Sequence, residues 1–104
     1  MAHYYALYID AVVKSGKAEY DIPMFVNCWL DEGQAIGRFP NGGPIPALID
    51  DYKRFAPHVD WISPDIYSND FRTYCQIYHR EDNLLFIPET HINPNRIWYA
   101  LSEC

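Results

Sequence analysis

The chain has 104 residues, a formal net charge of −6 and 49% hydrophobic residues, a composition typical of a folded globular domain and not of a disordered chain. No run of about 18 apolar residues occurs, which excludes a membrane-spanning helix, and the acidic balance argues against nucleic-acid binding. No signal peptide is visible, so the sequence leaves the compartment undetermined.

The first predicted elements are a helix, an apolar strand and a long loop. An apolar stripe at three- and four-residue spacing predicts a helix over residues 3–15, which Gly16 would end. Residues 24–30 are apolar at nearly every position, as in a strand that is buried on both faces of a parallel sheet. Residues 31–44 are rich in glycine and proline and are predicted to form a loop.

The rest of the chain alternates between amphipathic and apolar segments. In order, the pattern predicts a helix over 45–56, a strand over 59–67, a helix over 70–79, a strand over 84–89 and a helix over 96–103. Alternation of this kind implies an α/β fold with a parallel sheet and right-handed crossovers.

Polar and aromatic residues gather where each predicted strand ends. The first strand ends with Asn27 and Trp29, the second with Asp65 and Tyr67, and the third with Glu89, Thr90 and His91. Because ligands of parallel α/β folds bind at the carboxyl ends of the strands, we expect these side chains to form one rim around a ligand.

Most of these residues also have a purely structural interpretation. Asn27 could satisfy a neighbouring backbone group, Trp29 could pack in the core and Asp65 could cap a turn. Tyr67 could simply pack at the mouth of a barrel. Glu89 follows an apolar run directly, where an unpaired charge is costly, so its surroundings must supply hydrogen bonds. Such arrangements concentrate at functional sites, which makes Glu89 the strongest candidate.

Other chemistries have weaker support. Gly42-Gly43 precedes a helix but lacks the lysine and the further glycine of a phosphate-binding loop. The four histidines show no zinc-ligand spacing, so no metal site is predicted, and no cofactor is expected. Cys28 lies on a predicted buried strand and is expected to be an inert apolar side chain, while the three cysteines together form no disulfide pattern.

Four segments together resemble a known family. Residues 16–20, 23–27, 63–67 and 86–90 are similar to those of β-galactosidases of glycoside hydrolase family 35, and most similar to the bacterial β-galactosidase-like branch. The resemblance covers nearly the whole chain, with the segments in order and at sensible spacing.

The resemblance implies a retaining glycosidase of clan A, which hydrolyses terminal β-galactosides and is built on a (β/α)8 TIM barrel. A complete barrel needs roughly 250 residues. Residues 1–104 would therefore be a partial catalytic domain with about the fifth to seventh strands, and the first four strands and the last would be missing. On this basis the chain is expected to be a fragment of a bacterial protein, whose localisation stays unknown; a periplasmic or secreted parent is one alternative that the sequence leaves open.

The resemblance also implies roles for individual residues. Glu89 would be the catalytic nucleophile and Tyr67 would hydrogen-bond it, while Asn27 and Trp29, together with Asp65 and His91, would bind the substrate. The family places its acid/base glutamate after an asparagine, and no Asn-Glu pair occurs in this chain. The acid/base would therefore lie outside these residues, and the chain alone is expected to be inactive.

Two other functions are compatible with the same residues. A half-barrel with open sheet edges could self-associate or pair with another chain and have a structural role. Alternatively, Trp29, Trp61 and Tyr67 could form platforms for a sugar that is bound without catalysis.

Overall fold

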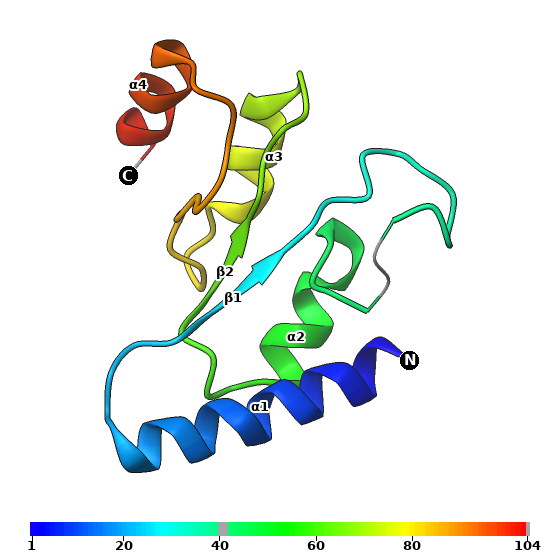
Figure 1. The fold of residues 1–104 in the computed structure, drawn as a ribbon, viewed down its shortest axis with the longest axis vertical. Coiled ribbons are helices and arrows are strands. Elements are labelled where there is room, and N and C mark those ends of the chain that lie inside the picture. Colours follow the sequence, from blue (N-terminus) through cyan, green and yellow to red (C-terminus); the bar gives the residue numbers. More distant parts are fainter. Residues whose placement is uncertain (40–41, 104) are drawn as a thin grey trace.

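The computed structural model describes residues 1–39 and 42–103, so Cys104 and part of the predicted loop lie outside the described residues. In chain order its elements are α1 (Ala2–Glu19), β1 (Phe25–Cys28), the 3-10 helix η1 (Pro46–Leu48), α2 (Ile49–Phe55), β2 (Trp61–Pro64), α3 (Phe71–Tyr78) and α4 (Pro94–Ser102) (Figure 1). The predicted alternation of helix and strand therefore holds as far as β2, and the chain is a small α/β domain.

The two strands lie side by side and run parallel, as predicted. Their register runs from Phe25 opposite Trp61 to Cys28 opposite Pro64. The pairing continues beyond the strands, because the Asp65 N–H donates to the Cys28 carbonyl at 2.9 Å. The first two predicted strands therefore do deliver their carboxyl ends to one edge.

The third predicted strand does not form, and the expected partial (β/α)8 barrel with its fifth to seventh strands is wrong. Asn83, which is 2% exposed, accepts the Ile62 N–H at 2.8 Å and donates to the Ile62 carbonyl at 3.0 Å. Its side-chain amide takes the backbone groups on the outer edge of β2 that a third strand would need. Residues 84–87 form no ladder, and the next backbone bridge, the parallel one between Ile66 and Thr90, lies beyond the end of β2. The described residues contain two strands in one sheet, too few for part of a barrel.

Helix α1 is longer than predicted, because Gly16 does not end it. The helix continues to Glu19, and a Cβ on Gly16 would lie 2.9 Å from Cε of Met24. The glycine thus allows the chain after the helix to pack closely against it. Only Ala6 and Val13 of α1 are buried, and the helix crosses beside α2 below the amino ends of the strands (Figure 1).

The other predicted helices are present with small shifts. The helix expected over 45–56 is divided into η1 and α2, and α3 matches its predicted range closely. Helix α4 begins at Pro94, two residues before the predicted start, because proline suits the first helical turn and Asn93 accepts the Asn95 N–H at 2.9 Å as a cap.

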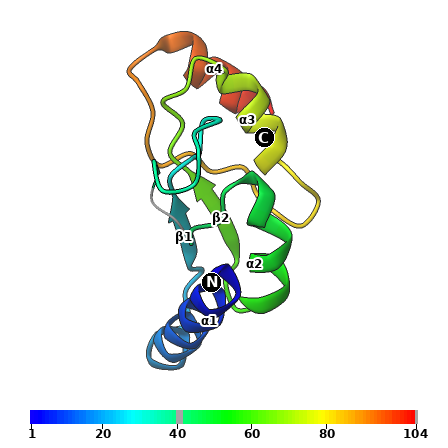
Figure 2. The same ribbon diagram turned by 90° about the vertical axis from the view of Figure 1, so that its right-hand side faces the viewer.

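The core lies between the sheet and helices α2 and α3, which cover the same side of the strands (Figures 1 and 2). Its largest fully buried side chains include Tyr52, Tyr78, Leu30 and Ile62. No helix in the described part of the chain is long and apolar enough to cross a membrane.

The opposite face of the sheet is partly open. Phe25 stacks on Trp61 with ring centroids 5.9 Å apart, and Phe86 meets both rings edge-on, yet Phe25 is 40% and Phe86 42% exposed. Among the described residues, Nε1 of Trp61 and Oγ of Ser63 are buried without a hydrogen-bond partner.

Candidate functional site

The candidate site lies where β1 and β2 end and where the segment before α4 passes them. β1 brings Asn27 to this rim and β2 brings Asp65 and Tyr67. Glu89 reaches the rim although it does not belong to a strand, because the Ile66 N–H donates to the Glu89 carbonyl at 3.0 Å. One backbone hydrogen bond therefore does what a third strand was expected to do.

Tyr67 and Glu89 form the central contact of the rim. The Tyr67 hydroxyl donates to Oε2 of Glu89 at 2.9 Å. This hydrogen bond is the main cause that raises the pKa of Tyr67 above its ordinary value of 10.0, because it favours the protonated phenol beside a carboxylate. Glu89 is exposed, so the expectation that its charge sits at the edge of an apolar core is wrong.

The buried carboxylate of the rim is instead Asp65, which is 8% exposed. Nδ2 of Asn27 donates to Oδ1 of Asp65 at 2.6 Å. The pKa of Asp65 is raised: burial is the main cause, the hydrogen bond from Asn27 opposes it, and the negative charge of Glu89 adds to it. Two carboxyl groups with different surroundings therefore lie within electrostatic reach of each other.

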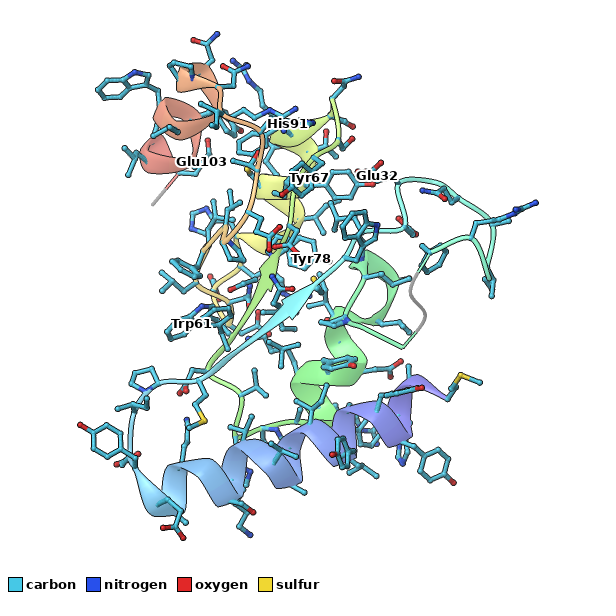
Figure 3. The ribbon with its side chains drawn as sticks, in the orientation of Figure 1. Glu32, Trp61, Tyr67, Tyr78, His91 and Glu103 are labelled. Atoms are coloured by element: carbon cyan, nitrogen blue, oxygen red, sulfur yellow. The ribbon has the colours of Figure 1, made fainter. Side chains whose placement is uncertain are left out.

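Aromatic side chains flank these carboxyl groups. The ring of Trp29, which is 47% exposed, stacks on Tyr67 with centroids 6.2 Å apart and planes at 29°. His91 meets the other side of Tyr67 edge-on at 5.0 Å, and Figure 3 shows the two residues next to each other. Rings of this kind, with a few placed polar groups between them, are what small polar ligands bind against.

All six residues predicted for the site are thus brought together. Each of them contacts at least one of the others, and the charge of Glu89 also acts on Asp65. Asn27 touches Asp65, Glu89 touches Tyr67, and Trp29 and His91 flank Tyr67. Their roles toward a substrate remain predictions.

One contributor to this rim was missed at the level of sequence. Arg96, in the first turn of α4, donates to the Thr90 hydroxyl and to the Ile66 and Ser68 carbonyls behind the rim. A cation in the first turn of a helix faces the positive end of the helix dipole. That unfavourable placement is a signal in the sequence that the side chain has partners elsewhere.

Other candidate chemistries receive no support from the described residues. No group of three or more His, Cys, Asp or Glu side chains in this part of the chain could hold a metal ion. Cys28 is 3% exposed, which confirms that it lies in the core, and its Sγ donates to the Tyr78 hydroxyl at 3.6 Å. Burial raises its pKa to about 11, which is typical of an unreactive thiol.

No family model matches the chain, and no curated protein matches it significantly. The resemblance of residues 63–67 and 86–90 to family 35 glycosidases therefore has no support from these comparisons.

Proposed function

We propose that this chain carries the nucleophile-bearing part of a retaining glycoside hydrolase site that acts on terminal β-galactosides. The observation that carries the proposal is the hydrogen bond of 2.9 Å from the Tyr67 hydroxyl to Oε2 of Glu89. A retaining glycosidase needs an ionised carboxylate that is held in a fixed orientation. A phenol that donates to one oxygen orients the group, stabilises its charge and leaves the other oxygen available.

The reaction would be a double displacement. Glu89 attacks the anomeric carbon, the bond from that carbon to the leaving oxygen breaks, and a glycosyl ester forms on the carboxylate. Water then attacks the same carbon and releases the sugar and the free carboxylate. A second carboxyl group, about 5–5.5 Å from the first, must protonate the leaving oxygen and later activate the water. We assign this group to polypeptide outside the 104 residues.

Asp65 is not a good candidate for the second carboxyl group. Its side chain is 8% exposed and accepts a hydrogen bond from Asn27 at 2.6 Å, so it has little freedom to meet a leaving group. We propose that Asn27 and Asp65 instead hydrogen-bond sugar hydroxyls at the inner edge of the site. The exposed ring of Trp29 and the edge-on His91 would contact the sugar beside them.

The proposal can be tested on this chain without the missing acid/base group. A 2,4-dinitrophenyl 2-deoxy-2-fluoro-β-galactoside loses its leaving group as a stable phenolate, so no proton donor is required. The fluorine slows the attack of water, so the glycosyl ester accumulates and intact-mass spectrometry with peptide mapping should find it on Glu89.

A matched control is available for this experiment. Glu89→Gln should form no adduct, whereas Glu81→Gln, which changes another exposed glutamate, should be labelled like the parent chain. Tyr67→Phe should be labelled more slowly, because it removes one hydrogen bond and leaves the nucleophile in place. Labelling that persists in Glu89→Gln, or no labelling of the parent chain, would refute the assignment of Glu89.

A second candidate function is sugar binding without catalysis. The observation that favours it is the row of Trp29, Tyr67 and His91, which presents aromatic surface beside a carboxylate and needs no second carboxyl group. In this case galactosides should shift the NMR signals of these three side chains, and no covalent adduct should form.

A further inference from the structure

Arg96 is the one basic side chain of the first turn of α4, and it reaches back to two other segments of the chain. Nη1 donates to the Ile66 carbonyl at 2.9 Å and to Oγ1 of Thr90 at 3.0 Å, and Nη2 donates to the Ser68 carbonyl at 2.8 Å. A single guanidinium thus connects the chain after β2 with the chain before α4.

These acceptors lie next to the two residues that form the central contact of the rim. Ile66 and Ser68 are the neighbours of Tyr67 on either side, and Thr90 directly follows Glu89. The same two segments also bond to each other, because the Thr90 hydroxyl donates to the Ile66 carbonyl at 2.7 Å and the Ile66 N–H donates to the Glu89 carbonyl at 3.0 Å. The backbone that carries the phenol and the backbone that carries the carboxylate are therefore joined by one network.

The chemistry of arginine suits this position. The guanidinium has five N–H donors in a rigid, planar fork, so it can hold acceptors from two segments in one geometry. Its plane is supported by Phe71, whose ring centroid lies 5.0 Å from Cζ. Within the described part of the chain Arg96 forms no ion pair, so its donors serve neutral oxygens and not a surface carboxylate.

We propose that Arg96 is a positioning residue, which holds the backbone on both sides of Tyr67 against the Glu89–Thr90 segment and thereby keeps the Tyr67 hydroxyl on the Glu89 carboxylate. Its consequence for glycosyl transfer rests on the proposed function. The positioning itself is a property of the folded chain and can be measured without a sugar.

The competing interpretation is that Arg96 only anchors α4. Loss of the side chain would then loosen the helix and lower the stability of the domain, but the contact between Tyr67 and Glu89 would persist. The two interpretations differ in one observable, which is the pKa of the Tyr67 hydroxyl.

This pKa is a reporter of the contact. It lies above 10.0 mainly because the hydroxyl donates to Glu89, with smaller contributions from burial and from the charges of Glu89 and Asp65. Another titratable group that faces the ring is His91, which meets it edge-on at 5.0 Å. An increase in the separation between the phenol and the Glu89 carboxylate should therefore lower the pKa of Tyr67.

The experiment follows the NMR titration of carbon-13-labelled tyrosines, with the Tyr67 signal assigned by its loss in Tyr67→Phe. Glu89→Gln defines the downward shift that corresponds to complete loss of the interaction. Arg96→Ala should lower the pKa of Tyr67 by at least half of that shift, and Arg96→Lys by an intermediate amount, because an ammonium cannot reproduce the fork. Arg72→Ala is the matched control: Arg72 lies over Tyr99 at 4.9 Å on the neighbouring helix and forms no hydrogen bond to either segment within the described residues.

The proposal is overturned if Tyr67 titrates in folded Arg96→Ala as it does in the parent chain. If Arg96→Ala fails to fold, Thr90→Val provides the same test, because it keeps the arginine and removes the hydroxyl that links Arg96 to the Glu89 segment. An unchanged pKa of Tyr67 in Thr90→Val also overturns the proposal. Absence of a glycosyl adduct on Glu89 would refute the proposed function and leave this titration unaffected, so the two failures can be told apart.

Discussion

Replacement of Asn83 by alanine should be among the most destabilising single substitutions in this chain. The side chain accepts the Ile62 N–H at 2.8 Å and donates to the carbonyls of Ile62 and Tyr78 at 3.0 and 2.8 Å. Alanine would leave three backbone groups without a partner at a position that is 2% exposed. A buried unsatisfied group costs about 1–3 kcal/mol, and water entering the vacated space offsets part of this, so we expect a loss of about 3–5 kcal/mol.

A loss of this size is large for a domain of 104 residues. Domains of this kind have a total stability of about 5–15 kcal/mol, and each kcal/mol corresponds to about 4–8 °C in the melting temperature. Asn83→Ala should therefore lower the melting temperature by about 15–30 °C and shift the urea midpoint, followed by tryptophan fluorescence, without a large change in the m-value.

Two comparisons make the reasoning specific. Asn69→Ala removes an exposed asparagine and should change stability by no more than about 0.5 kcal/mol. Asn83→Asp keeps the acceptor for Ile62 but turns an oxygen toward two carbonyls, so it should be destabilised at neutral pH and partly recover when the carboxyl group is protonated. If the free energy of unfolding of Asn83→Ala lies within about 1 kcal/mol of that of the parent chain, the side-chain amide does not replace a strand at this edge.

Three further outcomes follow from the structure. Burial raises the pKa of Cys28 from 9.0 to about 11, so the contribution of this thiol to stability should be at its full value below pH 9 and fall by about 2–3 kcal/mol between pH 9 and 11. Cys28→Ser does not titrate in this range and should lose less stability, as measured by urea unfolding on either side of pH 9. Equal losses in the parent chain and in Cys28→Ser would contradict this. Burial raises the pKa of Asp65 above 3.8, so the contribution of its carboxyl group to stability is present below pH 3.8 and is lost as the pH rises through the raised pKa. Asp65→Asn can still accept the hydrogen bond of Asn27 and should be at least as stable as the parent chain at pH 7. A clearly lower melting temperature of this variant would count against the direction of the shift. Within the described residues no strand lies beside the outer edge of β1, and Phe25 of this strand is 40% exposed on the open face of the sheet. Sedimentation velocity should therefore detect concentration-dependent self-association that Phe25→Lys reduces, whereas a monomer at every concentration would exclude it.

The sequence was sufficient to predict the elements whose hydrophobic pattern is local. Apolar periodicity located all four helices to within a few residues, and the apolar runs around Val26 and Ile62 identified two strands that do pair in parallel. The residues of the rim were also found from sequence, because polar side chains that follow an apolar run are brought to one edge whenever the runs lie side by side. Glu89 reaches the rim without belonging to a strand, because the Ile66 N–H donates to its carbonyl at 3.0 Å.

Tertiary structure alone decided where the sheet ends and which carboxylate is buried. An apolar run such as residues 84–87 is compatible with a strand, but strand formation needs free partners on the neighbouring edge, and Asn83 occupies those of Ile62. Likewise, Asp65 and Glu89 both follow apolar segments, and only packing against Asn27 and Cys28 makes Asp65 the buried one. The contacts of Arg96 with Ile66, Ser68 and Thr90 join segments that are separated in sequence, and no local pattern encodes them. Propensity and periodicity act between neighbours in the chain, whereas these outcomes depend on competition for backbone hydrogen bonds between segments that meet only in the folded state.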